Sequence, residues 1–198
     1  PRSTRKESSA ASDVYKRQPL RSKGVSVSVV MRFYIRLRMK KVSIFVDVQN
    51  IYYTTKQQFN SNFDYNKFWK LVTFQRQVVG AFAYTTDRGD KKQIQFQNIL
   101  RAIGFEVKLK PFISRSDGST KGDWDVGITV DIMEYAGKSD IVVLASGDGD
   151  FDVLIKRIRI LHNVSTEIYG VSNLTANSLK NETSHFFPIG DELLLKKT

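Results

Sequence analysis

Apolar residues change their spacing several times along the chain from residue 42 onward, and each spacing predicts one kind of element. Nearly continuous apolar runs, typical of strands buried on both faces, occupy residues 42–48, 78–84 and 141–145. A strand nearer a sheet edge is predicted at residues 105–112, a further strand at 164–169 and a short extended piece at 185–189. Helical spacing predicts helices at residues 64–74, 90–103, 124–135, 151–161 and 175–181.

This alternation of strands and helices predicts a three-layer α/β/α sandwich, in which helices cover both faces of a mainly parallel sheet. No internal repeat and no linker is evident in residues 39–198, so we expect them to form one domain. In such sheets, ligands bind beyond the carboxyl ends of the strands. The residues that follow the predicted strands are therefore the first place to look for chemistry.

The positive charge of the chain is concentrated in its first 38 residues. The whole chain carries a formal charge of +11; residues 1–38 hold ten basic and two acidic residues, a net +8, and residues 39–198 hold 21 and 18, a net +3. Because residues 9–18 resemble a translated sequencing adapter, we expect residues 1–38 to be an artefactual or disordered tail. Met39 is then the expected natural start, with Met31 as the next candidate. The alternative is a genuine basic arm that helps to bind nucleic acid.

Composition excludes several classes of site. A chain without cysteine has no disulfides, thiolate zinc sites or cysteine nucleophiles, and two histidines argue against a histidine-rich metal site. Neither a secretory signal nor an apolar run of about 20 residues is evident, so we expect a cytoplasmic protein without membrane association. Carboxylates are left as the main candidate metal ligands.

Aspartates gather where the predicted strands end. Asp47 lies at the end of the first apolar run, and Asp148 and Asp150 follow the most hydrophobic strand. Asp125 lies at the start of the helix that leads into that strand, and Asp131 comes six residues later. Because hard cations prefer carboxylate oxygens, this pattern predicts a Mg²⁺ or Mn²⁺ site. The alternative for Asp148 and Asp150 is a turn or helix-cap role. Asp131 lies about 240° round the helix from Asp125, which favours for it a surface role or a supporting role behind the ligands.

Three motifs resemble the NYN domain, specifically its LabA-like bacterial branch. They are Val46-Asp47-Val48-Gln49-Asn50, then Lys121-Gly122-Asp123-Trp124-Asp125-Val126 with Asp131 downstream, then Ser146-Gly147-Asp148-Gly149-Asp150-Phe151. They occur in the family's order, and the resemblance covers residues 39–198.

The resemblance implies a PIN-like fold and a ribonuclease that depends on Mg²⁺ or Mn²⁺. The residues it implies in catalysis are Asp47, Asn50, Asp125, Asp148 and Asp150. The resemblance implies that all of them except Asn50 are metal ligands. Asp131 matches a frequent aspartate of the family and is added to the implied metal ligands. The glutamate that many PIN domains carry between the first and third motifs has no clear counterpart, so a catalytically weak or inactive RNA-binding or regulatory module is the alternative. An aspartate-based phosphohydrolase is disfavoured, because it needs an aspartate at the position of Gln49.

RNA is the expected partner, with DNA as an alternative substrate. The expected nucleic-acid contacts are Lys121, Arg88, Lys91 and Lys92 to phosphates and Trp124 as a stacking platform. For the basic residues the alternative is solvated loop charge. The sequence leaves the oligomeric state open, with a homodimer among the options.

Overall fold

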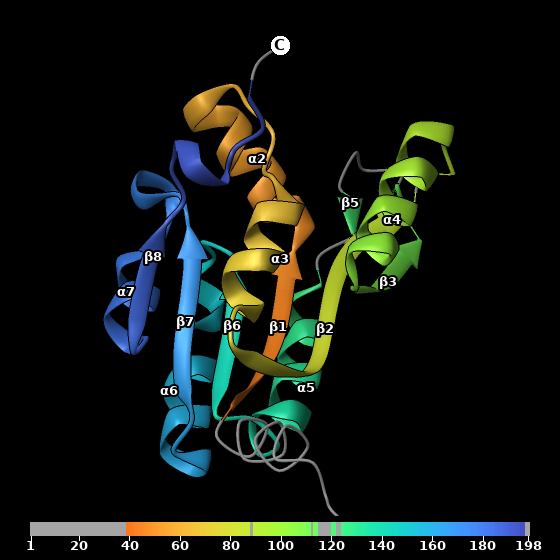
Figure 1. The fold of residues 1–198 in the computed structure, drawn as a ribbon. Helices are drawn as coiled ribbons and strands as arrows, with labels where there is room; N and C mark the ends of the chain where they lie inside the picture. The colour runs from red at the N-terminus through yellow and green to blue at the C-terminus, as the bar shows by residue number, and fades with distance from the viewer. Residues whose placement is uncertain (1–38, 88, 112, 115–119, 122–123, 197–198) are drawn as a thin grey trace, which may run out of the picture. The chain divides into compact units, whose positions relative to one another are not determined.

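A six-stranded parallel sheet forms the centre of the protein in a computed structural model that describes residues 39–87, 89–111, 113–114, 120–121 and 124–196 (Figure 1). Its strands are β1 (Lys40–Asp47), β2 (Arg76–Asp87), β3 (Glu106–Pro111), β6 (Ile141–Ala145), β7 (Ser165–Gly170) and β8 (His185–Pro188). Their order across the sheet is β3-β2-β1-β6-β7-β8, and every neighbouring pair is parallel. The predicted parallel sheet is confirmed.

Helices cover both faces of this sheet. One face carries α2 (Val48–Phe59), α3 (Tyr65–Thr73) and α4 (Lys91–Ile103). The other carries α5 (Asp125–Ala136), α6 (Asp152–His162) and α7 (Asn177–Glu182). Shorter elements are the antiparallel pair β4 (Ile113–Ser114) and β5 (Thr120–Lys121), and the 3₁₀ turns η1 (Gly149–Phe151), η2 (Ser172–Leu174) and η3 (Asp191–Leu193). The predicted α/β/α sandwich is therefore confirmed.

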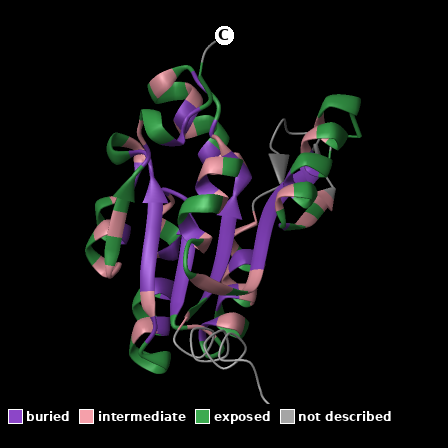
Figure 2. Ribbon diagram, viewed as in Figure 1, coloured by how far each residue is buried: buried purple, intermediate pink, exposed green. Residues whose placement is uncertain are grey.

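Each central strand supplies side chains to two cores, because successive residues of a strand point to opposite faces. Ile44 and Val46 pack under α2–α4, whereas Phe45, between them, packs under α5–α7. β6 is buried at all five positions, and Figure 2 shows the central strands buried along most of their length. This burial on both faces explains why these strands are continuous apolar runs.

Helix α2 is the one long element that the hydrophobic pattern does not predict. Only Val48, Ile51 and Thr55 of its twelve residues are buried, and the helix contains β-branched and aromatic residues with modest helix propensity. Its start is fixed instead by a cap, since the Asp47 side chain accepts a hydrogen bond from the backbone N–H of Asn50.

The strand order reverses between β1 and β6. From β1 the chain moves outward to β2 and β3, returns through α5 to β6 on the other side of β1, and moves outward again to β7 and β8. Such a reversal separates the connections that leave neighbouring strands and opens a crevice at their carboxyl ends. Here the crevice lies after Asp47 and Ala145.

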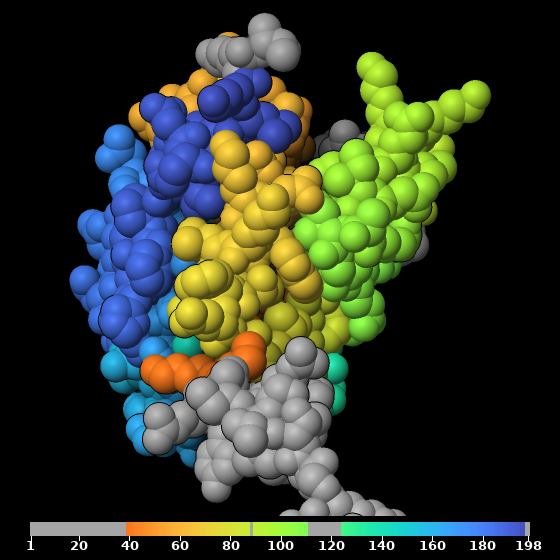
Figure 3. Space-filling view, viewed as in Figure 1, coloured from red at the N-terminus to blue at the C-terminus, as the bar shows by residue number. Residues whose placement is uncertain are grey.

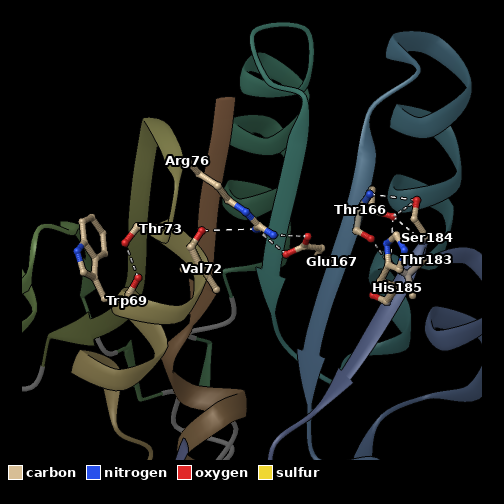
Figure 4. A network of polar contacts seen from close by, with 9 residues as sticks. All are labelled: Trp69, Val72, Thr73, Arg76, Thr166, Glu167, Thr183, Ser184 and His185. Carbon is tan, nitrogen blue, oxygen red and sulfur yellow. Dashed lines mark hydrogen bonds and ion pairs between the residues drawn. The ribbon is translucent and has the colours of Figure 1, made fainter. Parts of the chain in front are cut away.

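A charged pair crosses the sheet on the α3 side (Figure 4). The guanidinium of Arg76 donates to both carboxylate oxygens of Glu167, at 2.8 and 2.9 Å, and to the carbonyl of Val72 at 3.5 Å. The Glu167 side chain is only 7% exposed. The pair joins β2 to β7, two strands that are not neighbours in the sheet.

The predicted tail, residues 1–38, lies outside the described residues, so its separation from the domain stays a prediction. None of the helices in the described ranges is long and apolar enough to cross a membrane.

Candidate active site

Asp47 has two structural attachments at the carboxyl end of β1. One carboxylate oxygen, Oδ1, caps α2 by accepting the Asn50 N–H at 3.1 Å. The other, Oδ2, accepts a hydrogen bond from the Ser146 hydroxyl at 3.3 Å. Asp47 is only 9% exposed, and its two hydrogen bonds fix the side chain between the end of one strand and the loop after another.

The loop after β6 brings the later aspartates to the same place. The Ser146 hydroxyl oxygen also accepts the Asp148 N–H at 3.2 Å, and Asn50 Oδ1 accepts the Gly147 N–H at 2.9 Å. Position 147 requires glycine, because a Cβ there would lie 2.8 Å from the carbonyl oxygen of Leu174. These contacts join the ends of β1 and β6 directly, as the predicted convergence requires.

Asp148 and Asp150 have different roles in this loop. The Asp148 carboxylate caps η1 by accepting the Asp150 N–H at 3.0 Å, whereas the Asp150 side chain is exposed. The cap role that the sequence allowed for either residue belongs to Asp148, which leaves its other carboxylate oxygen for a ligand.

Negative charges crowd around Asp47. Burial first, and then the charges of Asp125 and Asp148, raise the pKa of its carboxyl from the ordinary 3.8 to about 6, against the opposing hydrogen bonds from Asn50 and Ser146. The three carboxylates therefore act on one another at a single edge of the sheet. A bound cation would relieve this repulsion.

The donor set fits a divalent cation in type and charge, since every candidate ligand is a carboxylate oxygen, the donor that Mg²⁺ and Mn²⁺ prefer. Among the described residues, however, no three acidic or histidine side chains lie close enough together to form a closed set of ligands. The described side chains therefore provide the negative charge that a metal ion needs, but in their present positions they do not form a complete coordination sphere.

Asp131 contacts residues of β2 and β3 rather than the other aspartates. Its carboxylate accepts a hydrogen bond from the Tyr84 hydroxyl at 2.7 Å and lies 3.1 Å from the Lys108 ammonium. Burial and the Asp131 carboxylate both raise the pKa of Tyr84, so the tyrosine stays protonated as a donor. The Asp131 side chain is only 17% exposed, so these contacts give it a structural role that ties α5 to β2 and β3, and its place among the metal ligands stays a prediction.

Replacing Asp131 with asparagine should lower the free energy of unfolding by about 2 kcal/mol, because a hydrogen bond to a charged group and an ion pair are lost. The RNA cleavage that the sequence predicts should persist, because Asp131 is held by Tyr84 and Lys108 and acts in packing. Urea denaturation and a cleavage assay measure the two effects, with Asp152→Asn on α6 as the matched control. Loss of cleavage at unchanged stability would contradict this role.

Three of the residues predicted to contact nucleic acid have described side chains. Lys91 and Lys92 are exposed in the first turn of α4. Trp124 is half-buried: its indole N–H donates to the carbonyl of Thr85 at 2.9 Å, its ring packs edge-on against Tyr84, and the Lys110 ammonium lies 5.5 Å from the ring centroid. Its burial leaves only part of the ring for stacking.

The side chains of two residues that are predicted to contact phosphates are not described. Arg88 lies outside the described residues, and for Lys121 only the backbone, in β5, is described. Their proposed contacts stay predictions.

Ser146 is the connecting residue that sequence reasoning missed. It was visible only as a polar residue directly after the most hydrophobic strand and before Gly147. Its fully buried hydroxyl links the aspartates of two strands.

A model of the NYN domain matches residues 41–190, most of the chain and all three motifs. The chain belongs to the NYN domain family. NYN domains are PIN-like and form an RNA-related family of nucleases, which agrees with the parallel sandwich and its acidic edge. The family predicted from the three motifs is thereby confirmed.

Two similar proteins show which NYN domains this one resembles. The low amplitude and bright protein LabA of Synechococcus elongatus is 26% identical over 162 residues, which cover 78% of this chain and 86% of LabA. The crystal structure of a Vibrio parahaemolyticus protein of unknown function is 51% identical with a TM-score of 0.76, and the match covers 79% of this chain and 97% of that one. The LabA-like character predicted from the motifs is confirmed.

Proposed function

We propose that this NYN domain is a ribonuclease that hydrolyses RNA phosphodiester bonds with Mg²⁺ or Mn²⁺. The observation that carries the proposal is Asp47, a buried carboxylate whose pKa is raised to about 6 by burial and by its neighbours Asp125 and Asp148. A protein seldom keeps such repulsion without a compensating cation. A bound ion would supply neutralising charge, activation of water and stabilisation of the charge that grows on the phosphate.

Asp47 and Asp148 would be the inner ligands, since the Ser146 hydroxyl links the carboxylate of Asp47 to the backbone N–H of Asp148. Asp125, in the first turn of α5, and the exposed Asp150 would complete the carboxylate set from the rim. Asn50 would position the substrate: its Oδ1 is held by the Gly147 N–H, which leaves its amide hydrogens to donate to a phosphate oxygen.

The RNA would approach over the loops beside this edge. Lys91 and Lys92 are exposed and would contact phosphates, and the accessible part of Trp124 would meet a base. Arg88 and Lys121 are proposed to extend this basic margin. DNA remains an alternative substrate, because phosphate contacts do not distinguish the two.

A second candidate is an RNA-binding or regulatory NYN module with weak or no turnover. The absence of a closed ligand set among the described side chains favours it, as does the missing PIN-type glutamate. Tight RNA binding that survives EDTA, with no cleavage in Mg²⁺ or Mn²⁺, would establish this alternative.

The deciding experiment is cleavage of a fluorescent single-stranded RNA by the purified protein. We expect cleavage in Mn²⁺ or Mg²⁺, complete loss of cleavage in EDTA and recovery when the metal is restored. Asp148→Asn, purified in parallel, is the control for contamination. If the variant cleaves as well as the wild type, the activity belongs to another protein.

A further inference from the structure

A cavity of about 570 Å³ lies between α2, α3 and α4, on the face of the sheet opposite α5 and α6. Figure 3 shows the surface hollowed between the α2 and α3 side chains and those of α4. A cavity of this size accommodates a nucleoside or a nucleotide. None of the candidate metal ligands lines it.

Helix α2 connects this cavity to the acidic edge. Asp47 caps the helix, and Gln49, Tyr52 and Tyr53, which follow within its first turns, line the cavity. Tyr65 lines it from α3, and after burial the negative charge of Asp47 is the second cause that raises the pKa of this tyrosine. The cavity wall therefore lies within electrostatic reach of the proposed catalytic carboxylate.

Aromatic rings form much of the wall. Tyr52 and Tyr53 pack edge-to-face, with ring centroids 5.4 Å apart, and are 48% and 56% exposed. Phe96 packs against Tyr65 at 5.4 Å on the opposite side. Half-exposed rings beside a cavity are suited to stack a flat ligand, and a base–aromatic stack does not depend on base identity.

Between the rings, the wall offers neutral hydrogen-bonding groups. The carboxamides of Gln49, Asn62 and Asn66 line the cavity, and such groups donate to and accept from the edges of bases. Tyr65 also lines the cavity and adds a phenol hydroxyl, which can donate or accept a hydrogen bond.

The charges that line the cavity argue against a phosphate as the group it recognises. Among the described lining residues Lys92 alone is basic, and it is accompanied by Asp64 and Asp90. Each aspartate caps a helix with one oxygen, Asp64 for α3 and Asp90 for α4. The walls match a neutral heteroaromatic ring.

We propose that this cavity binds a nucleobase, stacked on Tyr52 or Tyr53 and hydrogen-bonded through its edge. The base belongs either to a free ribonucleotide or to an RNA strand whose phosphate lies at the acidic edge. The strand-borne case rests on the proposed ribonuclease function, whereas the free nucleotide does not.

The test is binding by the full chain in EDTA, where RNA stays intact. The probes are AMP, GMP, CMP and UMP, with ribose 5-phosphate as the probe without a base, and an octaribonucleotide with and without one abasic position. The key variant is Tyr52→Ala. Its control is Phe74→Ala, another exposed aromatic, which lies at the end of α3 outside the cavity lining.

We expect nucleotides or the intact oligonucleotide to bind and Tyr52→Ala to weaken that binding about 10-fold, the loss of one base–aromatic stack. Phe74→Ala should bind like the wild type. Binding of free nucleotides would assign the site to a small ligand; binding of only the intact oligonucleotide, weakened by an abasic position, would assign it to the RNA strand. Chemical shifts of Gln49 and Tyr65 on ligand addition would place the ligand directly.

The inference is overturned if ribose 5-phosphate binds as tightly as the nucleotides, if no probe binds, or if Tyr52→Ala matches Phe74→Ala. Its failure is separable from that of the proposed function. Metal-dependent cleavage together with unchanged binding by Tyr52→Ala would contradict only the proposed nucleobase site. Nucleotide binding without RNA cleavage in any metal would contradict only the proposed ribonuclease function.

Discussion

Asp47→Asn should lower RNA cleavage by at least about 1,000-fold and, in EDTA at pH 7, make the protein more stable than the wild type. The expected gain follows from the raised pKa of Asp47, which burial and the charges of Asp125 and Asp148 bring from 3.8 to about 6. This rise in the pKa corresponds to a loss of about 3 kcal/mol in the free energy of unfolding of the wild type at pH values above 6, where the carboxylate is charged in both the folded and the unfolded state. Asparagine keeps the oxygen that caps α2 and removes the charge.

The pH dependence has a definite sign. Because the pKa of Asp47 is higher in the folded protein than in the unfolded chain, its protonated form stabilises the fold below about pH 4, and this contribution is lost as the pH rises through about 6. The stability difference between Asp47→Asn and the wild type should therefore be near zero at pH 4 and reach its full size above pH 6.

Urea denaturation at several pH values in EDTA measures this difference. Glu192→Gln, at an exposed position outside the site, is the control and should show no such trend. Adding Mg²⁺ or Mn²⁺ should reverse the order, since a ligand that binds only the folded wild type stabilises it. An Asp47→Asn variant that is less stable than the wild type at pH 7 in EDTA would show that Asp47 is a structural residue first.

The second large effect concerns the ion pair across the sheet. Arg76→Met should lower the free energy of unfolding by about 3–5 kcal/mol, because it leaves the Glu167 carboxylate buried without its partner. The melting temperature should fall by roughly 10 °C. Thermal denaturation followed by circular dichroism measures the change.

The chain offers a matched control for burial. Lys138 and Glu134 also lie 2.8 Å apart, but both side chains are more than half exposed. Lys138→Met should therefore change the melting temperature little, since exposed pairs contribute little. The double variant Arg76→Met/Glu167→Met should recover most of the loss, because an apolar pair leaves no buried charge. Equal losses for Arg76→Met and Lys138→Met would contradict the role given to burial.

The sheet and the convergence of aspartates were predictable, because both depend on local patterns. Runs such as residues 141–145 are apolar throughout since both faces are buried, and parallel strands bring their carboxyl ends to one edge. Asp47 and Asp148 could therefore be placed near one another from sequence position alone. Their catalytic roles stay predictions.

The remaining features depend on contacts between distant segments. Helix α2 has too few buried residues to show a clear period, and its cap is a side chain whose other oxygen contacts Ser146, 99 positions away. The partners of Asp131 come from β2 and β3, and nothing in the spacing of α5 indicates them. The pairing of Arg76 with Glu167 likewise requires that both strands already be placed.

The central position of β1 has a consequence for synthesis on the ribosome. One edge of β1 pairs with β2, which follows closely in sequence, but the other pairs only with β6, at residues 141–145. While the intervening chain is being made, an apolar strand has an unpaired edge, a state prone to association with other chains. Asp148 reaches Asp47 only when β6 docks, so closing that edge and completing the acidic cluster occur together, in a late step of folding.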